Sequence, residues 1–225
     1  MSTVTTPVDT QRTLGELVAE RPARARVFER RGIDYCCHGD RTLTAAATEA
    51  GIDLDEIATA LGAVEAVDDV VANQPVPKLI DHIVAVHHVY LRDELPLLEA
   101  LANKVATVHG KRHGELAEVA RLVRAVRRDL EPHLDDEEDA VFPAIRHHLD
   151  SGEPLDAALI DRLRDDHEVV GALLAELRQV SRDFAVPADA CASYRSLYTR
   201  LPELEADTFR HIHLENNVLF PALAS

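Results

Sequence analysis

The chain has 225 residues, a formal net charge of −16, 46% hydrophobic residues and 4% aromatic ones. This charge argues against nucleic acid or an anionic membrane as a partner, and no apolar run reaches the roughly 18 residues that a spanning helix needs. Because the chain shows no secretory signal and its three cysteines form no secreted disulfide framework, we expect a cytoplasmic protein.

Residues 1–66 predict a small helical domain, and residues 67–77 read as a linker. Thr13 and Glu16 have the spacing of a capping box, as do Asp53 and Glu56, and such a pair marks the start of a helix. The predicted helices are 13–20, 22–30, 42–50 and 53–62. Between the second and third helices lies a loop that carries two adjacent cysteines.

Residues 78–225 predict a second helical domain, whose first helix begins at about residue 77. Four long stretches have apolar residues at spacings of three and four: 77–107, 113–149, 155–182 and 188–221. Short breaks rich in glycine or proline separate them, so neighbouring helices run antiparallel. The fold class is therefore all-α, an up-down four-helix bundle preceded by a small helical domain.

A four-position pattern occurs twice in the bundle, at an offset of 78 residues. The first copy is His133, Glu137, Phe142 and Pro143, and the second is His211, Glu215, Phe220 and Pro221. A single His-x-x-x-Glu is more often a solvated helix face than a site. A solvated face has no reason to recur at a fixed offset, so we interpret the repeat as a duplicated helical hairpin whose copies share one site.

The repeat predicts a metal centre. Residues four apart lie on one face of a helix, and His88 and His167, 79 residues apart, reach the same layer from the other two helices. The predicted ligands are His88, His133, Glu137, His167, His211 and Glu215. This set is too large for one tetrahedral zinc and suits a pair of first-row metal ions, iron foremost. If both carboxylates bridge, a bridging oxide or hydroxide supplies a fifth ligand to each metal, and a sixth position stays open.

Three aspartates are candidate outer partners of the ligand histidines. Asp129 and Asp207 each lie one turn before a ligand histidine, and Asp166 adjoins His167. A histidine that binds metal usually donates its other ring N–H to a carboxylate or carbonyl, which fixes its orientation.

These residues carry a family resemblance. The region from about 78 to 221 resembles hemerythrin-like di-iron bundles. The whole chain is similar to the repair-of-iron-centres proteins, through Asp34-Tyr35-Cys36-Cys37 and through the run from His211 to Pro221. The resemblance implies iron at the six positions given above. The chain departs from the family where His38 follows the cysteines in place of glycine.

Cys36 and Cys37 have two interpretations. They can be two small packed side chains, or a dithiol that binds metal or forms a strained, readily reduced disulfide. With the resemblance, a role in redox chemistry or iron transfer is favoured.

Three functions compete. The leading one is repair of iron–sulfur clusters damaged by nitrosative or oxidative stress, by iron donation or by nitric oxide chemistry at the irons, with nitric oxide reduction as the enzymatic form. The alternative is an oxygen or nitric oxide binding or sensing protein without turnover. The third is a metal-free bundle that binds partners. The expected partners are damaged iron–sulfur proteins and small diatomic molecules, and the chain is expected to be a monomer or homodimer.

Overall fold

The computed structural model describes residues 8–64 and 71–223, and all regular structure within these ranges is helical, as predicted. An isolated bridge between Thr13 and Thr42 is the nearest approach to a strand among them. The described residues form two compact units. The first contains the residues up to His82 and those from Phe209 onward, and the second runs from Ile83 to Thr208.

The predicted helices of the N-terminal domain are present within a few residues. They are α1 (Leu14–Glu20), α2 (Ala25–Glu29), α3 (Leu43–Ala50) and α4 (Leu54–Gly62), with a 3-10 turn, η1, at Pro22–Arg24. Thr13 and Glu16 form the predicted capping box, and Asp53 caps α4. Of the predicted linker, residues 67–70 lie outside the described residues, and helix α5 (Val76–His82) already begins at its end.

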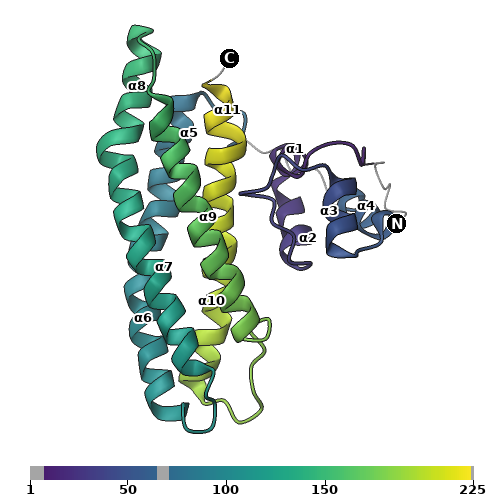
Figure 1. Cartoon of the computed structure of the whole chain (residues 1–225), viewed down its shortest axis with the longest axis vertical. Coiled ribbons are helices and arrows are strands. Elements are labelled where there is room, and N and C mark those ends of the chain that lie inside the picture. The colour runs from purple at the N-terminus through teal and green to yellow at the C-terminus, as the bar shows by residue number, and fades with distance from the viewer. Residues whose placement is uncertain (1–7, 65–70, 224–225) are drawn as a thin grey trace. The chain divides into compact units, whose positions relative to one another are not determined.

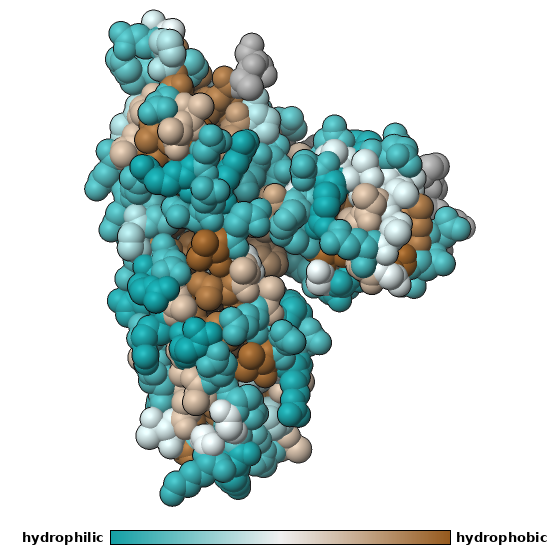
Figure 2. Space-filling view, viewed as in Figure 1, coloured by the Kyte–Doolittle hydropathy of each residue, from teal (hydrophilic) through white to brown (hydrophobic). Residues whose placement is uncertain are grey.

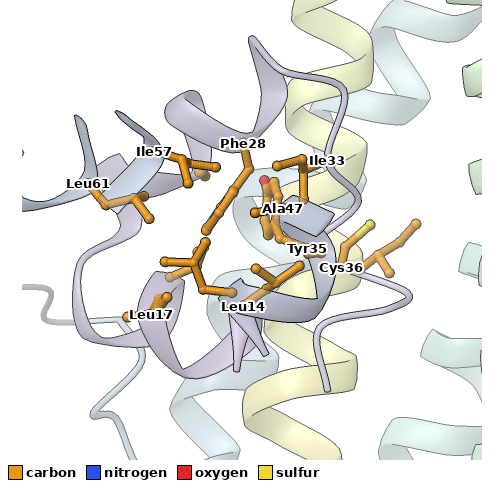
Figure 3. Packing of buried hydrophobic residues seen from close by; sticks show 14 residues of the cluster. Leu14, Leu17, Phe28, Ile33, Tyr35, Cys36, Ala47, Ile57 and Leu61 are labelled. Carbon is orange, nitrogen blue, oxygen red and sulfur yellow. The ribbon is translucent and has the colours of Figure 1, made fainter. Parts of the chain in front are cut away.

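The first unit has its own apolar core, shown in Figure 3. Leu14, Phe28 and Tyr35 are fully buried there, and Ile212, from the far end of the sequence, belongs to the same cluster. Burying such side chains contributes roughly 1.5–3 kcal/mol each. The C-terminal segment is therefore part of the core of the N-terminal domain.

The second unit is the body of the helical bundle. Its long helices are α6 (Val89–His109), α7 (Leu116–Asp136), α9 (Ala157–Val180) and the part of α10 (Ala192–Leu214) that precedes Phe209, and α7 continues toward α8 (Phe142–Ser151). They run side by side in Figure 1. Ion pairs join neighbours, such as Arg200 with Glu94 at 2.6 Å. The apolar stripe predicted on α7 is buried, as at Val119 and Val123.

The outer surface is rich in polar side chains, as the 28% share of charged residues in the sequence leads one to expect. Figure 2 shows a largely hydrophilic face with scattered hydrophobic patches. None of the described helices is both long and apolar enough to cross a membrane.

Within the described residues, three π-helical segments interrupt the long helices, which the sequence had predicted as continuous. They are η2 (Ile83–His88), η3 (Glu137–Val141) and η4 (Glu215–Leu219), and a short helix α11 (Phe220–Ala222) follows the last. After η3 the Phe142 N–H donates to the Glu137 carbonyl, five residues back. Pro143 comes next and has no N–H, so it can donate no bond to an α-helical ladder there. Each π segment begins or ends at a predicted metal ligand.

Candidate metal centre

Four of the predicted ligands converge inside the second unit. His88 ends η2, His133 lies in α7, Glu137 begins η3 and His167 lies in α9, and each is at most 3% exposed. His88 Nε2 lies 3.2 Å from Glu137 Oε2, and His133 Nε2 lies 3.3 Å from Glu137 Oε1. The Nε2 atoms of His133 and His167 are 3.2 Å apart. Ligand atoms of His133, Glu137 and His167 all lie within 4.8 Å of one another.

The outer nitrogens of two of these histidines meet carboxylates. His88 Nδ1 lies 2.9 Å from Glu138 Oε1, and His133 Nδ1 lies 3.4 Å from Asp166 Oδ2. A ring that donates Nδ1–H to a carboxylate presents a neutral Nε2 lone pair on its other side, which is the form that binds metal. Buried Nε2 atoms directed at one carboxylate thus fit a metal site, and the donor set of imidazole and carboxylate suits iron.

The remaining two ligands lie in the first unit. His211 is near the end of α10 and Glu215 begins η4, and both are 0% exposed. Their side chains face each other, with His211 Nε2 3.1 Å from Glu215 Oε1. Two residues four apart therefore point the same way, as the repeat predicted.

The three predicted outer aspartates have different neighbours. Asp166 lies beside His133, as described above. Asp129 accepts two hydrogen bonds from Arg128, at 2.7 and 3.0 Å. Asp207 accepts a hydrogen bond from Nδ1 of the buried His87, at 3.1 Å.

A cavity of about 630 Å³ reaches His133 from the surface of the second unit. Its lining is strongly charged and comprises Arg128, Asp129, Pro132, His133, Asp136, Arg162, Asp166 and Val169. Since Asp166 lies at Nδ1 of His133, the cavity lies beside the candidate centre, on the outer side of this predicted ligand.

The cysteines lie in a tightly bonded loop of the first unit. Asp34 Oδ1 accepts the backbone N–H groups of Cys36 and Cys37 at 2.9 and 3.0 Å, and Asp34 Oδ2 lies 2.7 Å from His38 Nδ1. Burial alone would raise the pKa of Asp34, but hydrogen bonds from His38 and the cysteines outweigh burial and lower it. Cys36 is fully buried and Cys37 partly so, and their sulfurs are 3.8 Å apart. Burial holds the pKa of Cys36 well above its usual value.

Asp34, Cys36 and Cys37 also bring ligand atoms within 4.8 Å of one another. The loop thus offers two sulfurs and one carboxylate oxygen as ligand atoms for a metal ion.

Sequence reasoning missed two residues. Glu138 holds His88 and is itself bonded to Arg92 at 3.0 Å. Asn217 donates to the Cys36 carbonyl at 3.0 Å. Both lie where the two copies of the repeat differ, since Glu138 matches Asn216 and Asp139 matches Asn217. A search for residues that the two copies share does not find such positions. The difference between the copies was the signal that could have identified them.

Comparison with known proteins gives two family matches. Residues 79–223 match the Hemerythrin HHE cation binding domain, and residues 10–65 match ScdA_N, a Domain of Unknown function (DUF542).

Similar proteins match nearly the whole chain. The iron-sulfur cluster repair protein ScdA of Staphylococcus haemolyticus is 33% identical over 212 residues, covering 92% of this chain and 95% of that protein. The iron-sulfur cluster repair protein YtfE of Cronobacter sakazakii is 32% identical over 210 residues, covering 92% and 94%. The protein of the same name from Yersinia pseudotuberculosis is 32% identical over 211 residues, with the same coverage.

Proposed function

Because this chain belongs to the family of iron–sulfur cluster repair proteins with a hemerythrin-like domain, we propose that it restores clusters damaged by nitrosative or oxidative stress, using non-haem iron held in its bundle. The observation that carries the proposal is the convergence of buried Nε2 atoms on Glu137, joined in one chain to a dithiol domain.

We propose that the bound cofactor is a pair of irons with a bridging oxide or hydroxide. The ligands would be His88, His133, Glu137, His167, His211 and Glu215. Three arguments support this set: all six side chains are buried, both His-Glu pairs have the same geometry, and the pairs repeat at a fixed offset. Iron bound by these residues would supply a change of oxidation state and a place for a small molecule to bind.

The residues around the ligands have distinct tasks. Glu138 and Asp166 accept the Nδ1–H of His88 and His133 and so keep the Nε2 lone pairs directed inward. Arg92 in turn holds Glu138 in place. The charged cavity beside His133 admits an ion or a diatomic molecule, and the apolar core around the site excludes bulk water.

The dithiol loop is proposed to serve redox chemistry or iron transfer to the damaged protein. Cys37 is the more accessible of the two thiols, and Cys36 lies directly behind it. A thiol pair of this kind works in a reducing compartment, which supports the cytoplasm as the place of action.

The test measures iron and repair together. The anaerobically reconstituted protein should hold two irons and restore activity to a [4Fe–4S] dehydratase that nitric oxide has inactivated. His133→Ala and His167→Ala should lose iron, and repair activity with it. Cys36→Ser with Cys37→Ser should keep the iron but repair more slowly. Wild-type protein that retains less than one iron per chain would refute the proposal.

A second candidate is binding of nitric oxide or oxygen without turnover. The cavity beside His133 favours it, since a carrier or sensor needs a small molecule to come close to the metal. Nitrous oxide formed from nitric oxide by the reduced protein in a single turnover would show chemistry. Reversible binding without nitrous oxide, together with no repair, would favour the second candidate.

A further inference from the structure

The side chain of Asn217 fills a notch between two glycines of the N-terminal domain. A Cβ on Gly15 would lie 2.6 Å from Asn217 Oδ1, and a Cβ on Gly39 would lie 2.3 Å from the same oxygen. Atoms in a packed interior do not approach so closely, so a side chain at either glycine would displace the amide. The Gly15 N–H donates to the Gly39 carbonyl at 2.8 Å, which holds the two walls of the notch together.

From this notch Asn217 bonds to the thiol loop. Its Nδ2 donates to the Cys36 carbonyl at 3.0 Å and lies 3.5 Å from the Tyr35 carbonyl. Asp34 binds the N–H groups of the same loop. Asn217 therefore makes the shortest bond to the Cys36 carbonyl, which Asn216 Nδ2 approaches at 3.5 Å, while Asp34 holds the N–H side of the loop. A loss of Asn217 weakens the hold on the carbonyl side.

Asn217 also belongs to the segment that carries two proposed ligands. It follows Glu215 by two residues within η4. The same segment buries Ile212 and His213 in the N-terminal domain, and the Tyr35 ring lies 5.6 Å from the His213 ring. A rotation of this segment that moved Glu215 would also withdraw Asn217 from its notch.

We propose that Asn217 is a positioning residue that joins the loop Tyr35–Cys37 to the segment bearing His211 and Glu215, so that metal binding by these two residues and the reactivity of the two thiols depend on each other. The presence of metal at His211 and Glu215 rests on the proposed function, whereas the contacts of Asn217 do not depend on it. Linkage makes the effect reciprocal: metal that fixes the segment protects the thiols, and a modified thiol loop weakens metal binding.

The first part of the test uses the full chain without metal. Maleimide alkylation of each cysteine is followed by mass spectrometry, with the exposed Cys191 as internal reference. Gly15→Ala and Asn217→Ala should each speed alkylation of Cys36 and Cys37 about tenfold, the factor expected for losing one hydrogen bond. The double variant should react no faster than either single variant, because both remove the same contact.

Gly114→Ala is the matched control, since no atom lies within 4 Å of its added Cβ. Alanine favours a helix over glycine, so Gly15→Ala would strengthen α1 if the notch were irrelevant. Circular dichroism confirms that each variant is folded. If Gly15→Ala and Gly114→Ala react alike, Asn217 does not position the loop.

The second part adds ferrous iron anaerobically. Iron should slow alkylation of Cys36 and Cys37 in the wild type but not in Asn217→Ala, and His211→Ala should abolish the protection. Protection that persists in His211→Ala means that iron binds the thiols directly, which overturns the coupling. Failure of the wild type to bind iron contradicts the proposed function instead, and the metal-free rates still decide the role of Asn217.

Discussion

The two ring nitrogens of the ligand histidines have different neighbours. At His88 and His133 the Nε2 atom faces Glu137, and the Nδ1 atom faces a carboxylate of its own. The ligand types could be predicted from the sequence, because helical spacing shows which residues share a face. The partner of His88 could not, because Glu138 points roughly 100° away from Glu137 on a helix and only the packing of η2 against η3 brings it to His88.

Asp34 is the residue whose ionisation matters most to the thiol loop. Replacing it with alanine removes the acceptor of two partly buried backbone N–H groups and should cost roughly 1–3 kcal/mol of unfolding free energy. Its pKa is lowered in the folded state, so its charge stabilises the fold above the unfolded pKa of about 3.9. That contribution is lost as the pH falls through the lower folded value.

Thermal unfolding from neutral pH down to about pH 3 checks this prediction against Asp34→Asn, which keeps the shape and loses the charge. At neutral pH the wild type should melt at a higher temperature than the variant, and this difference should disappear below about pH 4. A difference that is independent of pH would mean that the charge of Asp34 contributes nothing.

At the scale of elements, the helix boundaries were predictable and the π segments were not. Most helix ends could be placed within a few residues. The signals were capping residues such as Thr13 and Asp53, and breaks at glycine and proline. A π segment keeps the same apolar residues as an α-helix and inserts only one, so periodicity over a short window does not reveal it. The Phe-Pro pair after each His-x-x-x-Glu was the available signal, and it was interpreted only as a helix end.

Pro143 is predicted to maintain η3 and thereby the direction of Glu137. Pro143→Ala restores a backbone N–H, so the segment can relax into an α-helix and shift Glu137 relative to His88 on the neighbouring helix. Because Pro143 is exposed, little packing is lost. We expect unfolding stability to stay level or rise while iron affinity falls about 10–100-fold, as when groups that orient a ligand are lost.

Competition with a chelator measures that affinity. Pro202→Ala is the control, because Pro202 lies inside α10 without adjoining a π segment. Equal iron affinities in Pro143→Ala and the wild type would show that the proline does not orient Glu137.

At the scale of the molecule, the two compact units do not follow the order of the sequence. The chain from Phe209 onward groups with the N-terminal domain, and Ile212 is fully buried in that domain's core. Sequence reasoning predicted one domain over 78–225, because the repeat and the helical period continue to the end of the chain. Neither the repeat nor the helical period shows that the residues from Phe209 onward pack into the core of the first unit.

Removing the N-terminal domain should therefore impair the C-terminal ligands. A chain that begins at Val71 exposes Ile212 and Phe209 to water, at roughly 25 cal/mol for each Å² of apolar surface. We expect a lower melting temperature, a tendency to aggregate and less iron per chain than in the full protein. Iron analysis and light scattering check this, and a truncated chain with full iron content and unchanged melting temperature would contradict it.

The π segments also bear on how the chain arose. Both copies of the hairpin have a π-turn of the same kind at the same place, beginning at Glu137 and at Glu215 and followed by Phe-Pro. A trait common to two copies is inherited most simply from the single ancestor that was duplicated. Asn217, which meets the two glycines, stands where the first copy has the exposed Asp139, so this contact distinguishes the two copies. The π-turn at the glutamate is thus the feature that the two hairpins share, and the contact with the thiol loop belongs to the second hairpin alone.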